Sequence, residues 1–248
     1  MTKLSVNINK VATLRNTRTL GIPSVLHAAS LCIAAGAHGI TIHPRPDERH
    51  IRGTDVYELA DLLRKHPTVE FNIEGNPLIE YMHHVEAVKP TQCTLVPDAR
   101  EAFTSNQGWD LSGSNESRLR PLIKRLKDLG CRVSLFMDAG TEQLQKVKQL
   151  GADRIELYTE PYAAAFSRGD RSAVDAYATT AQRALDLGLG INAGHDLNLH
   201  NLPFFLSKVS GVAEVSIGHA LMGDALEFGL PETVKKYLAA CEAGRATK

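Results

Sequence analysis

Histidine and carboxylate side chains recur directly after short apolar segments of this chain. His43 ends one such segment, Glu74 follows a second, and His195 follows a third within the phrase Asn-Ala-Gly-His-Asp. Histidine exchanges protons near neutral pH, and a carboxylate in a cleft can share that task, so the three residues are candidates for general acid–base catalysis. The structural alternatives are a histidine that bonds a neighbouring carbonyl or caps a helix, and a carboxylate that caps a helix or forms an ion pair.

A second group of residues is suited to binding anions. Arg45, Arg49 and His50 form a basic cluster just after His43, and Gly218 with His219 lies between an apolar segment and the last helical pattern. Arginine binds phosphate through paired hydrogen bonds, and backbone N–H groups at a helix N-terminus do the same. The alternatives are a solvated turn and an ordinary strand-to-helix connection. Together, the two groups of residues favour a small phosphorylated substrate.

The same residues argue against a metal site. His43, His50 and Glu74 are possible ligands of a divalent ion, but Arg45 and Arg49 beside them would repel a cation. No H-x-H or D-x-D spacing occurs. We therefore expect neither a metal nor another cofactor.

Short β-rich segments alternate with longer amphipathic segments along the whole chain, in the pattern of βαβ units. The predicted strands cover 4–8, 39–43, 68–73, 92–96, 132–136, 154–158, 189–192 and 214–217. The predicted helices cover 24–35, 54–65, 78–88, 114–129, 142–150, 171–187, 201–209 and 231–239. Eight units without a linker favour a closed barrel over an open doubly wound sheet, so we predict an α/β fold, a single (β/α)₈ TIM-barrel domain over residues 1–248.

The predicted fold places the candidate residues together. Active sites of such barrels lie at the C-terminal ends of the strands, where His43, Glu74, His195 and Gly218 are all expected. The long segment 98–113, which contains the only tryptophan, is expected to be a lid or a binding loop at the same end.

Composition narrows the location and the partners. The chain has 28 basic and 28 acidic side chains, which disfavours binding to nucleic acid. No apolar run reaches the roughly 18 residues needed to cross a bilayer, and the N-terminus shows no signal-peptide pattern. The four cysteines form no C-x-x-C pair and are expected to be reduced. We expect a cytoplasmic protein without a membrane partner.

Beyond these patterns, the chain resembles the pyridoxine 5'-phosphate synthase family along nearly its whole length. The phrases that carry the resemblance are Val6-Asn7-Ile8, Ala12-Thr-Leu-Arg15-Asn16, Gly39-Ile-Thr-Ile-His43-Pro-Arg45, Arg49-His50-Ile51, Cys93-Thr-Leu-Val-Pro97, Val133-Ser-Leu-Phe136, Asn192-Ala-Gly-His195 and Ile217-Gly-His219-Ala220. The resemblance implies a (β/α)₈ barrel that joins 3-amino-2-oxopropyl phosphate to 1-deoxy-D-xylulose 5-phosphate. It also implies a homo-oligomer, an octamer in the family.

The resemblance also implies individual roles. His43 would be the proton acceptor, Glu74 a second acid–base group and His195 the proton donor, with Glu70 a competitor for the role of Glu74. Asn7 would bind the amino-oxopropyl phosphate. The residues that would hold substrate or phosphate are Arg18, Arg45, His50, Thr104, Gly218 and His219.

The chain departs from the common family pattern at three positions in two segments. Asn9 and Lys10 stand where the family commonly has Asp-His, at positions that contact the xylulose phosphate. Lys10 is expected to supply a compensating charge. Asp196 stands where the family commonly has Gly, so a substrate contact there would rely on the backbone. The rival interpretations are another phosphosugar isomerase or aldolase barrel and a barrel that only binds phosphate ligands; an imine-type aldolase would need a lysine in the central strands, which the sequence lacks.

Overall fold

Eight parallel strands close into a barrel in chain order, with β1 hydrogen-bonded to both β2 and β8. The computed structural model describes residues 1–246. The strands are β1 Lys3–Asn7, β2 Gly39–Ile42, β3 Glu70–Gly75, β4 Gln92–Leu95, β5 Arg132–Met137, β6 Arg154–Tyr158, β7 Gly190–Gly194 and β8 Val212–Ile217. The predicted (β/α)₈ barrel is therefore confirmed.

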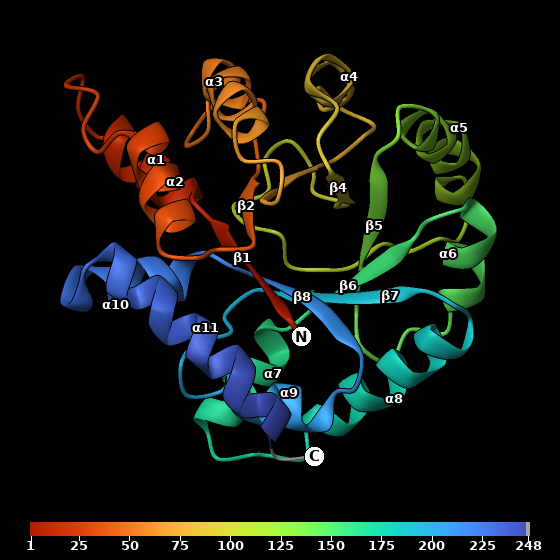
Figure 1. Ribbon diagram of the computed structural model, residues 1–248. Helices are drawn as coiled ribbons and strands as arrows, with labels where there is room; N and C mark the ends of the chain where they lie inside the picture. The colour runs from red at the N-terminus through yellow and green to blue at the C-terminus, as the bar shows by residue number, and fades with distance from the viewer. Residues whose placement is uncertain (247–248) are drawn as a thin grey trace.

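The helices form an outer ring around these strands (Figure 1). They are α1 Asn9–Asn16, α2 Val25–Ala34, α3 Gly53–Arg64, α4 Met82–Val88, α5 Asn115–Asp128, α6 Leu144–Leu150, α7 Glu160–Ser167, α8 Val174–Asp186, α9 Leu202–Lys208, α10 His219–Phe228 and α11 Leu230–Ala246. Several helices end at a glycine in the left-handed conformation, for example Gly130 with φ 84° and Gly151 with φ 88°. Glycine adopts this conformation without a Cβ clash, so it stops the helix and turns the chain into the next strand.

Two sequence-based expectations were wrong in detail. The third strand is shifted to Glu70–Gly75, so Glu74 lies inside β3 and does not follow it. Three helices at the carboxyl ends of strands were also missed: α1, α7 and α10. Each has only eight to ten residues and follows its strand almost directly, so no long apolar repeat marked it.

The inside of the barrel is polar. Gln92 on β4 donates to Glu214 on β8, and Asn192 on β7 donates to Gln92, so these side chains meet across the barrel axis. Ser5 and Thr41 hydroxyls lie 2.7 Å apart on neighbouring strands. Alternate strand residues point outward and are apolar, and they pack against the helices. The hydrophobic core is therefore a shell between strands and helices, and it leaves the barrel interior free for polar groups.

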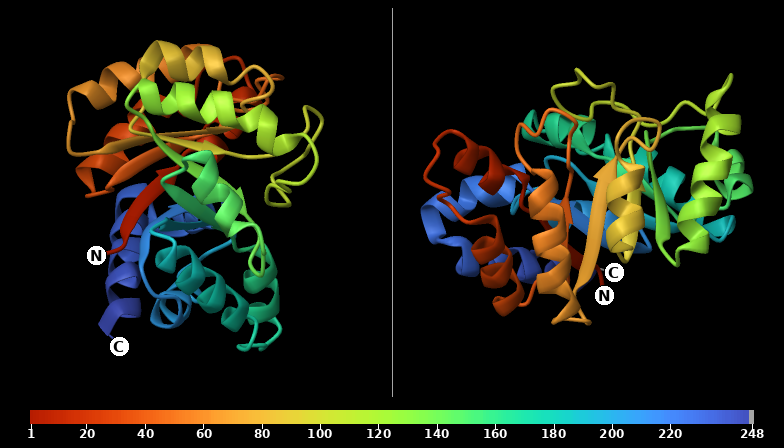
Figure 2. Two further views of the ribbon diagram at one scale, coloured as in Figure 1. Left: turned by 90° about the vertical axis from the view of Figure 1, so that its right-hand side faces the viewer. Right: turned by 90° about the horizontal axis from the view of Figure 1, so that it is seen from above.

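The segment after β4 is anchored to the barrel by its tryptophan. Trp109 is buried, its indole N–H donates to the Leu95 carbonyl at 2.9 Å, and its backbone N–H donates to the Phe136 carbonyl. Figure 2 shows the loops after the strands gathered at the end of the barrel opposite the N-terminus. Trp109 thus anchors this segment to β4 and β5.

Two further observations concern the whole chain. All four cysteines are buried and free. Within residues 1–246, no helix combines the length and the apolar character that a membrane span requires.

Candidate active site

His43 and Glu74 form a buried pair at the carboxyl ends of β2 and β3. His43 Nδ1 lies 3.8 Å from Glu74 Oε2, and both side chains are almost inaccessible to water. The register of the strands, with Ile42 opposite Ile73, puts these two residues side by side. Asn7 donates to Glu74 Oε2 at 3.4 Å, and the Asn9 side chain accepts from the His43 backbone N–H at 2.9 Å. The pair is held by neighbours from the first strand and the first helix.

The pKa values of this pair are shifted in opposite directions by the same cause. Burial raises the pKa of Glu74 to about 8, and the negative charge of Asp98 adds to that. Burial also lowers the pKa of His43 well below its usual value, and the Arg45 charge adds to that. At neutral pH the site therefore contains a protonated carboxyl beside a neutral imidazole. One can give a proton and the other can take one.

Glu156 is a further buried carboxyl at this end of the barrel, and it is not among the candidate site residues predicted from the sequence. It lies on β6, is 2% exposed, and accepts a long hydrogen bond of 3.5 Å from Thr94. A Cβ on Gly194 would come within 2.6 Å of Glu156 Oε1, so glycine is required there for the carboxyl to fit. Burial raises the pKa of Glu156 well above its usual value, followed by the charge of Glu74. Its position two residues after the inward-facing Arg154 was the signal that could have identified it.

His195 lies directly after β7, at the same end of the barrel as Glu74 and Glu156. Its ring packs against Phe136, with ring centroids 5.5 Å apart, and edge-on against Tyr158 at 5.4 Å. Burial lowers the pKa of His195, while the nearby Asp196 charge opposes that shift. His195 is also among the charges that lower the pKa of His43. The charge on His195 therefore influences the protonation of His43.

The basic cluster after β2 lies against the segment 98–106. Arg45 donates to Asp98 at 2.5 Å and to the Ala102 carbonyl at 2.9 Å, and Arg49 donates to the same carbonyl at 3.0 Å. The His50 ring is 6.3 Å from the His43 ring, and burial lowers its pKa to about 4, with Arg45 contributing. The two arginines therefore attach the first part of the loop after β4 to the segment after β2.

Gly218 and His219 lie at the N-terminus of α10, as a phosphate site requires. Gly218 is the residue before the helix, and His219, the first residue, is exposed. A Cβ on Gly218 would come within 3.1 Å of the Asn7 side chain, so glycine lets Asn7 approach the helix terminus. Asn7 thus lies between the acid–base pair and the backbone N–H groups of α10.

Four other predicted residues lie at the rim. Lys10 is exposed on α1, and Asp196 is exposed beside His195. Arg18 and Thr104 are exposed in connecting segments, and their side chains form no hydrogen bond or ion pair with the part of the chain that is described. The structure therefore does not bring Arg18 and Thr104 into contact with the His43–Glu74 pair.

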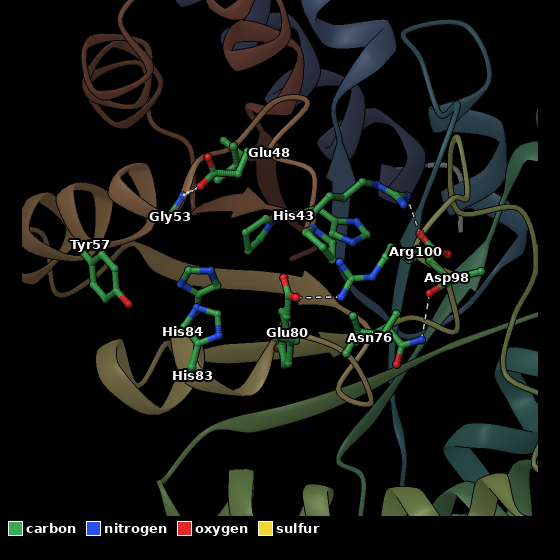
Figure 3. Close-up of a pocket in the computed structure, with 17 residues that line it drawn as sticks. His43, Glu48, Gly53, Tyr57, Asn76, Glu80, His83, His84, Asp98 and Arg100 are labelled. Atoms are coloured by element: carbon green, nitrogen blue, oxygen red, sulfur yellow. Dashed lines mark hydrogen bonds and ion pairs between the residues drawn. The ribbon is translucent and has the colours of Figure 1, made fainter.

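Two cavities reach this region. One, of about 350 Å³, extends from His43 and Arg45 outward between α3 and α4 to Tyr57 and His84, and Figure 3 shows these side chains around it. The other, of about 590 Å³, is an apolar groove between α1, α2 and α10 with Lys10 at its edge. Across residues 1–246, no three His, Cys, Asp or Glu side chains are grouped as metal ligands.

Comparisons with known proteins agree on one family. The family described as "Pyridoxal phosphate biosynthesis protein PdxJ" matches residues 4–243. A pyridoxine 5'-phosphate synthase from Albidiferax ferrireducens is 57% identical, over 99% of each chain. The enzyme of the same name from Porphyromonas gingivalis is 51% identical, over 96% of this chain and 98% of its own.

Solved structures resemble the chain in fold alone. A 3-hexulose-6-phosphate synthase superposes with a TM-score of 0.62 at 12% identity, over 96% of this chain and 99% of its own. A phosphoribosylanthranilate isomerase from Thermotoga maritima gives a TM-score of 0.56 at 12% identity, over 98% and 99% of the two chains. At that level of identity, the shared property is the barrel.

Proposed function

Because the chain belongs to the PdxJ family, the pyridoxine 5'-phosphate synthases of vitamin B6 biosynthesis, we propose that it condenses 3-amino-2-oxopropyl phosphate with 1-deoxy-D-xylulose 5-phosphate. The products are pyridoxine 5'-phosphate, phosphate and water. The observation that carries this reaction is the contact between His43 and Glu74, with opposite pKa shifts, facing His195 across the barrel mouth. Imine formation, enolisation, dehydration and ring closure are successive proton transfers, and such a site can perform them without a metal or other cofactor.

His43 acts as the proton acceptor in this proposal, since its neutral state leaves a ring nitrogen free to take a proton. Glu74 relays protons as the second acid–base group, because a carboxyl with a pKa of about 8 changes state readily near neutral pH. Glu70, the competitor for this role, lies at the other end of β3, where it is bonded to Lys3 and Arg132. That location favours Glu74 over Glu70 as the second acid–base group.

His195 acts as the proton donor, which requires a charged imidazole. Its pKa is lowered by burial, with Arg45 and Lys10 contributing to that direction. Two phosphorylated substrates would bring negative charge next to these cations, and negative charge raises the pKa of an imidazole. Substrate binding itself therefore prepares His195 to donate.

The remaining residues bind the two phosphates. Asn7 holds the amino-oxopropyl phosphate, and the α10 N-terminus at Gly218 and His219 holds a phosphate group. Arg18, Arg45, His50 and Thr104 hold substrate. Asn9 and Lys10 line the xylulose phosphate side, and Asp196 contributes its backbone. Arg18 and Thr104 would have to reach substrate by movement of their exposed segments.

We also propose that the enzyme is a cytoplasmic homo-oligomer, an octamer as the family resemblance implies. The support within this chain is the apolar groove beside α1 and α10. Its border carries exposed apolar side chains, namely Leu14, Ile22 and Leu226. Exposed apolar side chains grouped in this way are typical of a contact between subunits.

The direct test is to mix the purified protein with both phosphates, without metal or nucleotide, and to follow the ultraviolet absorbance of pyridoxine 5'-phosphate. We expect product only when both substrates are present, and none above background from His195→Ala. The variant should keep the fold because His195 lies at the mouth and not in the hydrophobic core. Absence of product from the wild-type protein, with each phosphate still bound in calorimetry, would instead indicate a barrel that only binds phosphate ligands.

A further inference from the structure

The backbone that carries His195 has an unusual conformation. His195 has φ 77° and Asp196 has φ 55°, so two consecutive residues with side chains adopt the left-handed region. Residues with a Cβ rarely adopt it, and two in succession do so only where the surroundings impose it. Some neighbouring group must therefore hold this turn.

Thr159 is the neighbour that holds it. This residue follows β6 and is fully buried. Its hydroxyl donates to the Gly194 carbonyl at 2.6 Å and to the His195 carbonyl at 2.5 Å, and its backbone N–H donates to the Gly194 carbonyl at 3.0 Å. One side chain thus fixes both peptide groups that flank the start of the turn.

The His195 ring has no comparable polar restraint of its own. Neither ring nitrogen is hydrogen-bonded to any residue within 1–246, and the ring instead rests against Phe136 and Tyr158. Aromatic contacts limit where a ring can lie but tolerate sliding, whereas the backbone conformation sets its direction. The orientation of the imidazole ring consequently depends on the backbone turn that Thr159 holds.

We propose that Thr159 is a positioning residue for His195: its buried hydroxyl locks the left-handed turn and so directs the imidazole into the barrel mouth. This inference deepens the proposed function and rests on it for its kinetic consequence. Displacement of a catalytic group by about 1 Å can cost about 100-fold in rate, which sets the size of the expected effect.

The test compares Thr159→Val, which keeps the shape and removes the hydroxyl, with Thr159→Ser, which keeps the hydroxyl. We expect kcat of Thr159→Val to fall by about 100-fold with KM changed by less than about threefold, and Thr159→Ser to stay within about threefold of wild type. Thr233→Val is the matched control. Thr233 lies on α11, is also fully buried, and donates to the backbone carbonyl of Gly229 just before that helix. It should lose a similar amount of stability and keep its kcat.

Titration of His195 by NMR gives a readout that does not depend on turnover. The residue is half-buried, and the charges that face it are Asp196 and Asp98, which raise its pKa, and Arg45 and Lys10, which lower it. If the ring is released towards water in Thr159→Val, its pKa should rise towards the ordinary value, and it should not change in Thr233→Val. An unchanged His195 pKa in a folded Thr159→Val protein, or a kcat equal to that of Thr233→Val, would overturn the proposal. Because the titration needs no substrate, it decides the positioning role even if the wild-type protein makes no pyridoxine 5'-phosphate.

Discussion

Two layers of carboxylates occupy the same barrel interior with different partners. At the N-terminal end, Glu70 is bonded to Lys3 and Arg132, and Glu214 lies 3.7 Å from Arg132 and 3.9 Å from Arg154. At the C-terminal end, Glu74 and Glu156 have no lysine or arginine within ion-pair distance among the described residues; Glu74 lies 3.8 Å from the neutral His43 ring. We call these the lower layer and the upper layer.

The difference appears in the protonation of the carboxyls. Burial opposes ionisation of Glu70, but hydrogen bonds from Arg132 and Lys3 prevail and lower its pKa. Burial prevails for Glu74 and Glu156 in the upper layer, and their pKa values rise. Burial also raises the pKa of Glu214 in the lower layer, although the charges of Arg132 and Arg154 oppose that shift without a direct hydrogen bond. A buried carboxylate surrounded by cations is a structural group, whereas one without them can exchange protons near neutral pH. Direct hydrogen bonds from cations, which Glu70 accepts and Glu214, Glu74 and Glu156 do not, decide which of these buried carboxyls stays ionised.

The largest expected effect comes from Glu74→Gln in the upper layer. Glutamine keeps the shape but cannot exchange a proton, so we expect kcat to fall by about 1,000-fold, within the range for loss of a general acid–base group. Thermal unfolding should show no loss of stability, since no buried ion pair is broken. Steady-state kinetics measure kcat, and a thermal melt measures the stability. A variant with nearly normal kcat would remove Glu74 from the mechanism.

The second effect should be large for stability and small for chemistry. Arg132→Met leaves Glu70 and Glu214 without their shared cation, and breaking a buried pair in this way costs about 3 kcal/mol or more. Denaturant unfolding should show this loss, while kcat of the folded protein stays close to that of the wild type. A large loss of kcat in a protein of unchanged stability would show that the two layers are not separate.

The third effect concerns pH. The folded-state pKa of Glu74 is about 8 and its ordinary value is 4.5, so the folded protein binds the extra proton between these limits. Wild-type stability should therefore decrease relative to Glu74→Gln as the pH rises from about 4.5 to about 8, by at most about 1.4 kcal/mol per pH unit, and level off above that. Denaturant unfolding of both proteins at several pH values measures the difference. Parallel curves would contradict the raised pKa.

The smallest effect should come from Lys3→Met at the rim of the lower layer. The Lys3 side chain is 43% exposed, so water screens its bond to Glu70, which keeps Arg132 as a partner. We expect a loss below about 1 kcal/mol in denaturant unfolding. A loss of unfolding free energy as large as that of Arg132→Met would mean that Lys3 and Arg132 stabilise the lower layer equally.

The sequence alone predicted the order of the eight strands and of most of the helices, and it predicted that the candidate site residues follow the carboxyl ends of the strands. Apolar alternation and the glycine stops are local signals, because strand and helix periods are set by the backbone. His43, His195 and Gly218 could be selected in the same way, since each follows a strand directly. The short helices α1, α7 and α10 were missed because they are too brief to show a period.

Only the tertiary structure decided which of these residues act on each other. His43 contacts Glu74, and the charge of Glu74 acts on Glu156. Arg45 donates a hydrogen bond to Asp98, and Thr159 donates one to the His195 carbonyl. Each of these interactions joins residues from different strands or loops. The physical reason is that a pKa depends on burial and on charges a few ångströms away in space. Sequence neighbours supply some of these charges, as Arg45 does for His43 and Asp196 for His195, but burial is the largest cause and arises only once the barrel has closed.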